Sequence, residues 1–97
     1  MIAELLLTGK ANARTGSDLC KLARLSLREL TSVIMEERRQ GAPICATSDN
    51  SHPGYYLAED QQEMASFCEG LKQRAEEIFR TREACLKTLD SLPKAKE

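Results

Sequence analysis

Thiol and imidazole groups, which act both as nucleophiles and as zinc ligands, come in this chain from four cysteines and a single histidine. Cys20, Cys45, Cys68 and Cys85 are separated by 25, 23 and 17 residues, and His52 is isolated from all of them. Structural zinc sites use pairs of ligands a few residues apart, so the spacing favours neither a metal site nor a cofactor. We expect Cys20, Cys68 and Cys85 to be small apolar packing residues, and only Cys45 is a candidate for an exposed redox thiol.

A catalytic site is not expected either. The sequence has no nucleophile placed beside its histidine, no glycine-rich phosphate loop and no evident pair of carboxylates. We therefore predict that the chain is not an enzyme.

A different chemistry is indicated by one side of a predicted helix that ends before Gly41. With Leu30, Val33 and Ile34 turned inward, helical spacing places five side chains on the opposite side: Arg28, Thr31, Ser32, Met35 and Arg39. Arginine can form two hydrogen bonds to guanine, hydroxyls can bond to bases or phosphates, and methionine gives apolar contacts. An ordinary solvated helix face is the alternative, since Glu36 and Glu37 reduce the positive charge.

Two capping sequences, eleven residues apart, define the elements that position these side chains. Thr15-Gly16-Ser17-Asp18 and Ser26-Leu27-Arg28-Glu29 both fit the pattern in which a hydroxyl and a carboxylate cap the start of a helix. They predict a first helix from about Gly16 to Ala23, a turn at Arg24-Leu25, and a longer second helix, which together form a helix-turn-helix. Its inward residues in the first helix and the turn are predicted to be Leu19, Leu22, Ala23 and Leu25.

The segments on either side complete a small domain. Gly41 and Pro43 end the second helix, and residues 43–47 and 54–58 are predicted to form a β-hairpin around a polar loop. In this hairpin Ile44, Ala46, Tyr55 and Leu57 would face the helices, leaving Cys45 and Tyr56 outward. At the start of the chain, residues 2–8 are predicted to form a helix whose Leu5 and Leu6 cover the helix pair.

The order of these elements carries a family resemblance. Leu25-Ser26-Leu27-Arg28-Glu29-Leu30, then Gly41-Ala42-Pro43-Ile44-Cys45, then Gly54-Tyr55-Tyr56-Leu57 resembles winged helix-turn-helix domains, particularly small ones encoded by bacteria and their phages. The resemblance covers roughly residues 1–58 and implies a winged domain over residues 1–59, with the second helix in the major groove of DNA. It further implies phosphate contacts from Lys21, Arg24, Arg39, Lys10, Arg14 and His52.

Residues 60–97 are predicted to form a long helix that serves as a dimerisation element. A repeat of alternating four- and three-residue steps is typical of coiled coils, and only Arg82 interrupts its apolar character. The apolar positions of this repeat are Met64, Cys68, Leu71, Ala75, Ile78, Cys85, Leu89 and Leu92. The alternative is a helix that folds back or breaks near Gly70 and completes a monomer.

Charge and hydropathy limit the function classes. Residues 1–40 hold seven Lys/Arg against five Asp/Glu, residues 41–60 none against three, and residues 61–97 seven against seven. The absence of a strongly basic footprint argues against tight nonspecific DNA binding. Since no apolar run is long enough to span a membrane and the start lacks the features of an export signal, a cytoplasmic location is expected.

The sequence therefore predicts a mainly α fold with a small β-hairpin: a winged helix-turn-helix followed by a long C-terminal helix. The expected function is that of a homodimeric, sequence-specific protein that binds double-stranded DNA, either a transcriptional regulator or a phage-type replication or control factor. The alternative is a winged module that binds another protein instead of DNA.

Overall fold

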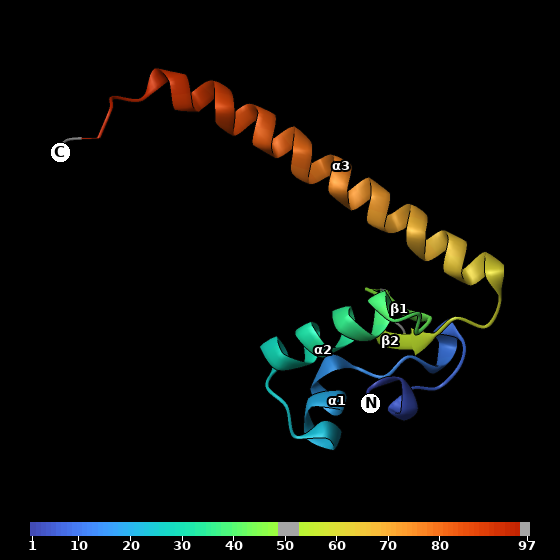
Figure 1. The fold of residues 1–97 in the computed structure, drawn as a ribbon. Helices are drawn as coiled ribbons and strands as arrows, with labels where there is room; N and C mark the ends of the chain where they lie inside the picture. The colour runs from blue at the N-terminus through green and yellow to red at the C-terminus, as the bar shows by residue number, and fades with distance from the viewer. Residues whose placement is uncertain (49–52, 96–97) are drawn as a thin grey trace. The chain divides into compact units, whose positions relative to one another are not determined.

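The computed structural model describes residues 1–48 and 53–95 of the chain (Figure 1). It divides into two compact units, Met1–Phe67 and Cys68–Glu97, which we call the head and the stem. The elements in chain order are η1 (Ala3–Leu5), η2 (Lys10–Asn12), α1 (Gly16–Ala23), α2 (Leu27–Arg39), β1 (Ile44–Thr47), β2 (Gly54–Leu57) and α3 (Gln61–Ser91). The predicted class, mainly α with a small β-hairpin and a long C-terminal helix, is confirmed.

Local capping explains where α1 and α2 begin. The Thr15 hydroxyl accepts a hydrogen bond from the Asp18 N–H at 3.1 Å. At α2 the capping box is complete: the Ser26 hydroxyl accepts from the Glu29 N–H at 3.1 Å, and the Glu29 carboxylate accepts from the Ser26 N–H at 2.9 Å. The predicted bounds of α1 and the predicted start of α2 are therefore confirmed.

The end of α2 is also determined by neighbouring residues. Gly41 has a φ of 104°, a conformation that glycine adopts without a steric penalty. Its N–H donates to the Arg38 carbonyl at 3.0 Å, and the Ala42 N–H donates to the Glu37 carbonyl at 2.9 Å. This pair of bonds is the Schellman arrangement, which satisfies the last carbonyls of the helix and turns the chain toward β1.

Strand β2 lies between β1 and the N-terminal segment. On one side it pairs antiparallel with β1, in a register that runs from Ile44 opposite Leu57 to Thr47 opposite Gly54. On the other side, the Gly9 N–H donates to the Leu57 carbonyl at 2.9 Å. Five residues further on, Arg14 and Tyr55 exchange two backbone bonds of 2.8 Å each.

This pairing corrects the prediction of a helix over residues 2–8. Only the single 3-10 turn η1 forms, and the chain is extended at Leu6. The Leu7 carbonyl accepts from the Leu57 N–H at 2.9 Å, so this segment pairs with β2. The segment therefore pairs with the edge of β2 and does not form a helix, because hydrogen bonds to β2 satisfy its backbone N–H and C=O groups.

Gly54 is required where β2 meets the N-terminal segment. Its φ is 124°, and a Cβ added there would overlap the Arg14 carbonyl and lie 2.9 Å from the Thr15 Cα. A glycine inside a strand often marks a close approach of two backbones, and here it allows the Arg14–Tyr55 bridge.

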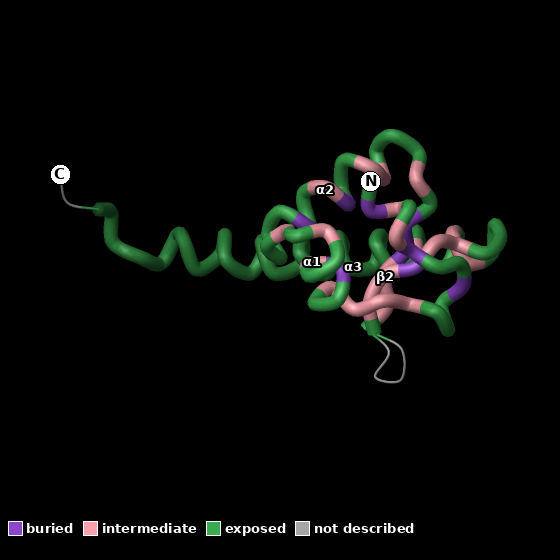
Figure 2. Tube along the Cα trace, turned by 90° about the horizontal axis from the view of Figure 1, so that it is seen from below, coloured by how far each residue is buried: buried purple, intermediate pink, exposed green. Residues whose placement is uncertain are grey.

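The core of the head lies between the helix pair, the N-terminal segment and one face of the hairpin (Figure 2). One prediction about it is wrong: Leu22 is 54% exposed, because α1 turns Leu19, Cys20 and Ala23 inward. At the N-terminus Leu6 is buried and Leu5 packs against the core, as predicted, and Ile2 is fully buried as well. The buried side chains of this core are Ile2, Leu6, Leu19, Leu30, Ile34 and Ile44.

The second face of the hairpin is also covered, contrary to the prediction. Cys45 is fully buried and Tyr56 is 5% exposed. The Cys45 sulfur lies 3.7 Å from the Met64 sulfur at the start of α3. Burial, followed by the nearby Cys45 and Glu63, raises the pKa of the Tyr56 hydroxyl. Cys45 is therefore a packing residue, and the idea of an exposed redox thiol at this position is wrong.

The first two turns of α3 are attached to the head by polar contacts. The Asp60 carboxylate accepts from the Glu63 N–H at 2.9 Å and so caps the helix. The Glu63 carboxylate in turn accepts from the Glu59 N–H at 2.8 Å and from the Lys10 N–H at 3.3 Å. The head thus ends inside α3, beyond the last residue of the hairpin.

In the stem, α3 runs without a break through Gly70 to Ser91. Every described residue of the stem is exposed, including Cys68 and Cys85, whose packing would need a partner (Figure 2). Within the described part of the chain, no helix is both long and apolar enough to cross a membrane.

Candidate nucleic-acid interface

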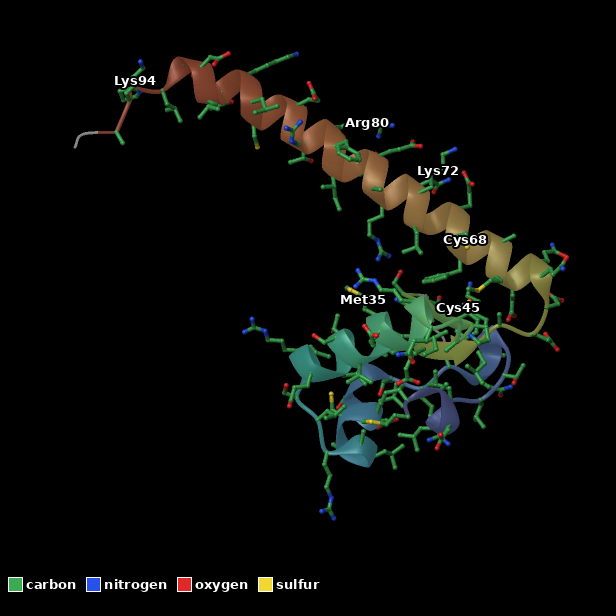
Figure 3. The ribbon with its side chains drawn as sticks, in the orientation of Figure 1. Met35, Cys45, Cys68, Lys72, Arg80 and Lys94 are labelled. Atoms are coloured by element: carbon green, nitrogen blue, oxygen red, sulfur yellow. The ribbon has the colours of Figure 1, made fainter. Side chains whose placement is uncertain are left out.

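The surface of α2 that points away from the core carries the side chains predicted to read DNA. All five are exposed, and Met35, seen projecting from α2 in Figure 3, is 46% exposed. A helix of this length extends about 20 Å, enough to cross the major groove. We call this surface the α2 outer face and define it as Arg28, Thr31, Ser32, Met35 and Arg39.

The hydroxyl groups on the α2 outer face are not equivalent. The Thr31 hydroxyl donates to the Leu27 carbonyl at 3.0 Å, within the helix. Its oxygen therefore has only acceptor capacity left for a ligand. Ser32 is exposed on the next position and offers a hydroxyl that can both donate and accept.

The carboxylates of α2 differ in the groups that bind them. The Glu29 carboxylate is held by the Ser26 backbone N–H and then by the Ser26 hydroxyl, which together lower its pKa. Glu36 is exposed and accepts from the Gln40 amide at 3.2 Å. Glu29 and Glu36 are thus both exposed on one flank of the outer face, and the Glu29 carboxylate is already bound by the helix cap.

Glu37 points to the opposite side, toward the start of the chain. Its carboxylate accepts from the Ile2 N–H at 2.7 Å, from the Ala3 N–H at 3.0 Å and from the Met1 nitrogen at 3.2 Å. Burial raises the pKa of this carboxyl, but the bonds from Ala3, Ile2 and the amino group outweigh that effect and lower it. The α2 outer face is therefore less acidic than the sequence suggests.

The flanking cations differ in how available they are. Lys21 and Arg24 are exposed at the end of α1, and Arg24 adopts the left-handed conformation with a φ of 57°. Lys10 is exposed on η2. Arg14 is half-buried, and its Nε is enclosed without a hydrogen-bond partner among residues 1–48 and 53–95. His52 lies outside the described residues.

Arg38, which the sequence did not single out, has a structural position. Its Nε donates to the Ile44 carbonyl at 2.8 Å, and its guanidinium carbon lies 4.8 Å from the centre of the Phe67 ring. It therefore joins α2 to β1 and to the start of α3. Neighbouring arginines in sequence thus separate, with Arg38 turned inward and Arg39 on the outer face.

The stem presents the second surface of interest. Side chains of Cys68, Lys72 and Arg80 project from α3 along its length (Figure 3). Met64, also predicted for the dimer interface, is half-buried against Cys45 in the head. The remaining apolar positions of the repeat are exposed and form what we call the stem stripe: Cys68, Leu71, Ala75, Ile78, Cys85, Leu89 and Leu92.

The stem stripe is broadened by Phe79, which is 63% exposed, and by Leu86. Near its C-terminal end, a shallow apolar hollow is lined by Thr81, Ala84, Cys85, Thr88, Leu89 and Leu92. Arg82 stands within the repeat, and its guanidinium lies 3.7 Å from the Glu83 carboxylate. An unpaired apolar surface of this kind usually marks an interface.

No group of three or more metal-binding side chains occurs among the described residues. Comparisons of the chain with protein-family models, curated proteins and solved structures found no match. The α2 outer face and the stem stripe are therefore the features from which a function can be inferred.

Proposed function

We propose that this chain is a homodimeric, sequence-specific DNA-binding protein whose α2 enters the major groove. The observation that carries the proposal is the α2 outer face: two arginines, two hydroxyls and one methionine, all exposed on one side of a capped helix. The helix-turn-helix arrangement and the adjacent hairpin support it, as does the resemblance to winged helix-turn-helix domains.

The proposed roles follow from position along α2. The N-terminal residues of a recognition helix reach base edges, so Arg28 is proposed to contact guanine and Ser32 a base or phosphate. Met35 would give an apolar contact deeper in the groove. Lys21, Arg24, Arg39 and Lys10 would bind backbone phosphates and fix the orientation of the head.

Arg14 has a smaller part in this proposal. Its backbone is paired with Tyr55, and its side chain is half-buried. We propose that Arg14 contributes to DNA binding through its positive charge and not through a direct contact with a phosphate.

The low net charge makes a second head necessary for tight binding. With a net charge of −1 and only a few proposed phosphate contacts in each head, the nonspecific attraction of one chain to DNA is weak. A dimer presents each contact twice and reads a palindromic site. The stem stripe supports self-association.

The free energy gained by burying the stem side chains is similar in size to the cost of bringing two chains together. Removing large apolar side chains from water contributes about 1.5–3 kcal/mol each when burial is complete. The stem side chains are already partly covered, so two stems gain at most roughly 10–20 kcal/mol, against an association cost of about 4–15 kcal/mol. The residues concerned, 39–63% exposed in one chain, are Leu71, Ile78, Phe79, Leu86, Leu89 and Leu92.

Within this proposal the protein acts by binding and not by catalysis, in the cytoplasm, as a transcriptional regulator or a phage-type replication or control factor. Its test is selection from a random DNA duplex library, with the Arg28→Ala chain selected in parallel. Enrichment of a common motif by the native chain, and its loss with Arg28→Ala, is the expected result. Equal behaviour of the two chains would remove Arg28 from DNA reading.

A second candidate function is the binding of another protein. Leu22 is 54% and Leu27 is 63% exposed, close to the turn between α1 and α2. Exposed leucines at this position favour a protein partner over a phosphate backbone. A folded dimer that enriches no DNA motif would favour this candidate.

A further inference from the structure

The alternating three- and four-residue steps of the stem repeat determine which layers a paired helix would form. The steps of three and four assign coiled-coil position a to Cys68, Ala75, Arg82 and Leu89, and position d to Leu71, Ile78, Cys85 and Leu92. All of these are exposed in the single chain. Their pairing with a second copy therefore depends on the direction of the partner helix.

A parallel pair of stem helices would be destabilised by Arg82. In a parallel dimer each core layer joins the same position of both chains, so Arg82 would face the partner's Arg82 in the middle of an apolar seam. Two guanidinium groups in the same core layer repel each other, and burial increases the repulsion because the surroundings are less polar than water. The single interruption of the stripe thus selects against the parallel arrangement.

We propose that the occupant of the stem stripe is the stem of a second copy, in antiparallel orientation, centred on residue 80. Reversing one helix brings each a position opposite a d position. Arg82 then packs its aliphatic part on the partner's Ile78, and its charge can remain near Glu83, 3.7 Å away in its own chain. The other layers become Cys68 with the partner's Leu92, Leu71 with the partner's Leu89, and Ala75 with the partner's Cys85.

The boundary between head and stem supports this register. Pairing about residue 80 uses residues 68–92, which are the exposed part of α3 from the first residue of the stem to Ser91 and the residue that follows the helix. A register shifted by one heptad toward the head would place the partner's Leu89 on Met64. Met64 is already occupied, because it packs on Cys45 within the head.

The aromatic residue beside the stripe agrees with the same centre. Phe79 is 63% exposed and directly follows Ile78, a d position. In an antiparallel pair, the residues that follow d positions on one helix lie beside the same residues of the partner. Near residue 80, Phe79 would meet the partner's Phe79 at the symmetry axis. Two aromatic rings brought together in this way contribute to an interface beyond the area they bury.

The inference rests on the dimer of the proposed function, and the stem cysteines allow a direct test. In the antiparallel pair position 75 lies opposite the partner's Cys85, so Ala75→Cys should form a disulfide there under mild oxidation. Within one helix these positions are separated by about 15 Å, too far for a disulfide. Any such bridge therefore joins two chains.

The experiment oxidises native, Ala75→Cys and Gln73→Cys chains with a glutathione buffer and measures covalent dimer on non-reducing gels. Gln73 is the control, since it lies on the opposite side of the helix. We expect at least about ten times more covalent dimer for Ala75→Cys than for the other two. Trypsin should yield a linked pair of peptides, 75–80 and 83–87, because cleavage after Arg74, Arg80, Arg82 and Lys87 isolates each cysteine.

Two outcomes would overturn the proposal. A bridge between the two copies of Cys85 in the native chain, in place of the 75–85 bridge, would show a parallel pair and leave the dimer intact. A monomer by light scattering at the same concentration would remove the dimer itself, and so would reject the proposed assembly and not only its direction.

Discussion

The Glu37 carboxylate accepts a hydrogen bond from the Ile2 N–H at 2.7 Å, which joins the recognition-helix candidate α2 to the start of the chain. The same carboxylate accepts from the Ala3 N–H, so one acidic side chain holds the η1 turn. The bond has two consequences: it anchors the N-terminal segment that pairs with β2, and it turns a negative charge away from the α2 outer face.

The variant Glu37→Gln should therefore destabilise the head. Its amide has one acceptor where the carboxylate has two, and hydrogen bonds to a charged group contribute about 1.5–3 kcal/mol each. We expect a loss of about 2 kcal/mol at pH 7 in urea unfolding. Glu36→Gln, which changes an exposed carboxylate, is the control and should leave the free energy of unfolding within about 0.5 kcal/mol.

The same variant should change the pH dependence of stability. Because the folded-state pKa of Glu37 lies below its ordinary value of 4.5, its contribution is complete above pH 4.5 and is lost as the pH falls through the folded-state pKa. The difference between native and Glu37→Gln chains should therefore shrink when unfolding is repeated at about pH 3. A constant difference at both pH values would mean that the charge of Glu37 contributes nothing.

The variant Gly54→Ala should destabilise the head severely. The added methyl group would overlap the Arg14 carbonyl, and its φ of 124° is strained for alanine. We expect a loss of about 3 kcal/mol or more, by thermal or urea unfolding. Gly70→Ala is the matched control: nothing lies within 4 Å of its added Cβ, so a gain of about 0.5–1 kcal/mol in helix stability is expected. Similar effects of the two substitutions would contradict the close backbone approach at Gly54.

The variant Arg28→Ala should lose specific DNA binding without loss of fold. Removal of a bidentate contact to guanine costs about 1–3 kcal/mol, a reduction of about 5- to 150-fold in affinity, and relaxes the preference at one base pair. Fluorescence anisotropy with the selected duplex measures it. Arg74→Ala removes an exposed arginine of the stem and should bind as the native chain does. An equal decrease for both variants would indicate only a general charge effect.

The double variant Leu71→Asp with Ile78→Asp should be a monomer. It places four carboxylates in the seam of a paired stem, and burial of unpaired charges is strongly unfavourable. Light scattering at a concentration where the native chain is a dimer measures the change. The control is Gln73→Asp with Arg80→Asp, which has the same spacing on the opposite side of α3 and should remain dimeric. A persistent dimer in Leu71→Asp/Ile78→Asp would place the interface outside the stem stripe.

Prediction from sequence worked where the determinants are local. Both helix starts depend on residues three positions apart, such as Ser26 and Glu29, and the end of α2 depends on Gly41. The inward residues Leu30 and Ile34 follow from helical spacing alone. These features are present in a short window of sequence, so the elements could be predicted before their packing was known.

Prediction failed where contacts join distant parts of the chain. The N-terminal segment was expected to be a helix, since nothing near it shows that β2 has a free edge. Cys45 and Tyr56 were expected to be outward, because the return of Met64 onto the hairpin is not visible locally. Gly54 was the one available signal, since a glycine that opens a strand often marks a close backbone approach.

At the candidate site, too, local features could be predicted and features that depend on distant contacts could not. The residues of the α2 outer face were selected by periodicity, and the structure exposes all of them. The inward positions of Glu37 and Arg38 were missed, because each depends on a partner at least six residues away, Ile2 and Ile44. Their orientation matters, since it removes one negative and one positive charge of α2 from that surface.

The most direct measurement is in-vitro selection from a random duplex library at moderate and at raised salt, with the mass of the protein in solution recorded at the same concentration. We predict a palindromic motif, bound by a dimer, whose enrichment over other sequences persists at raised salt because base contacts and not phosphate contacts specify it. A folded dimer that enriches no motif at either salt concentration would contradict sequence-specific DNA binding.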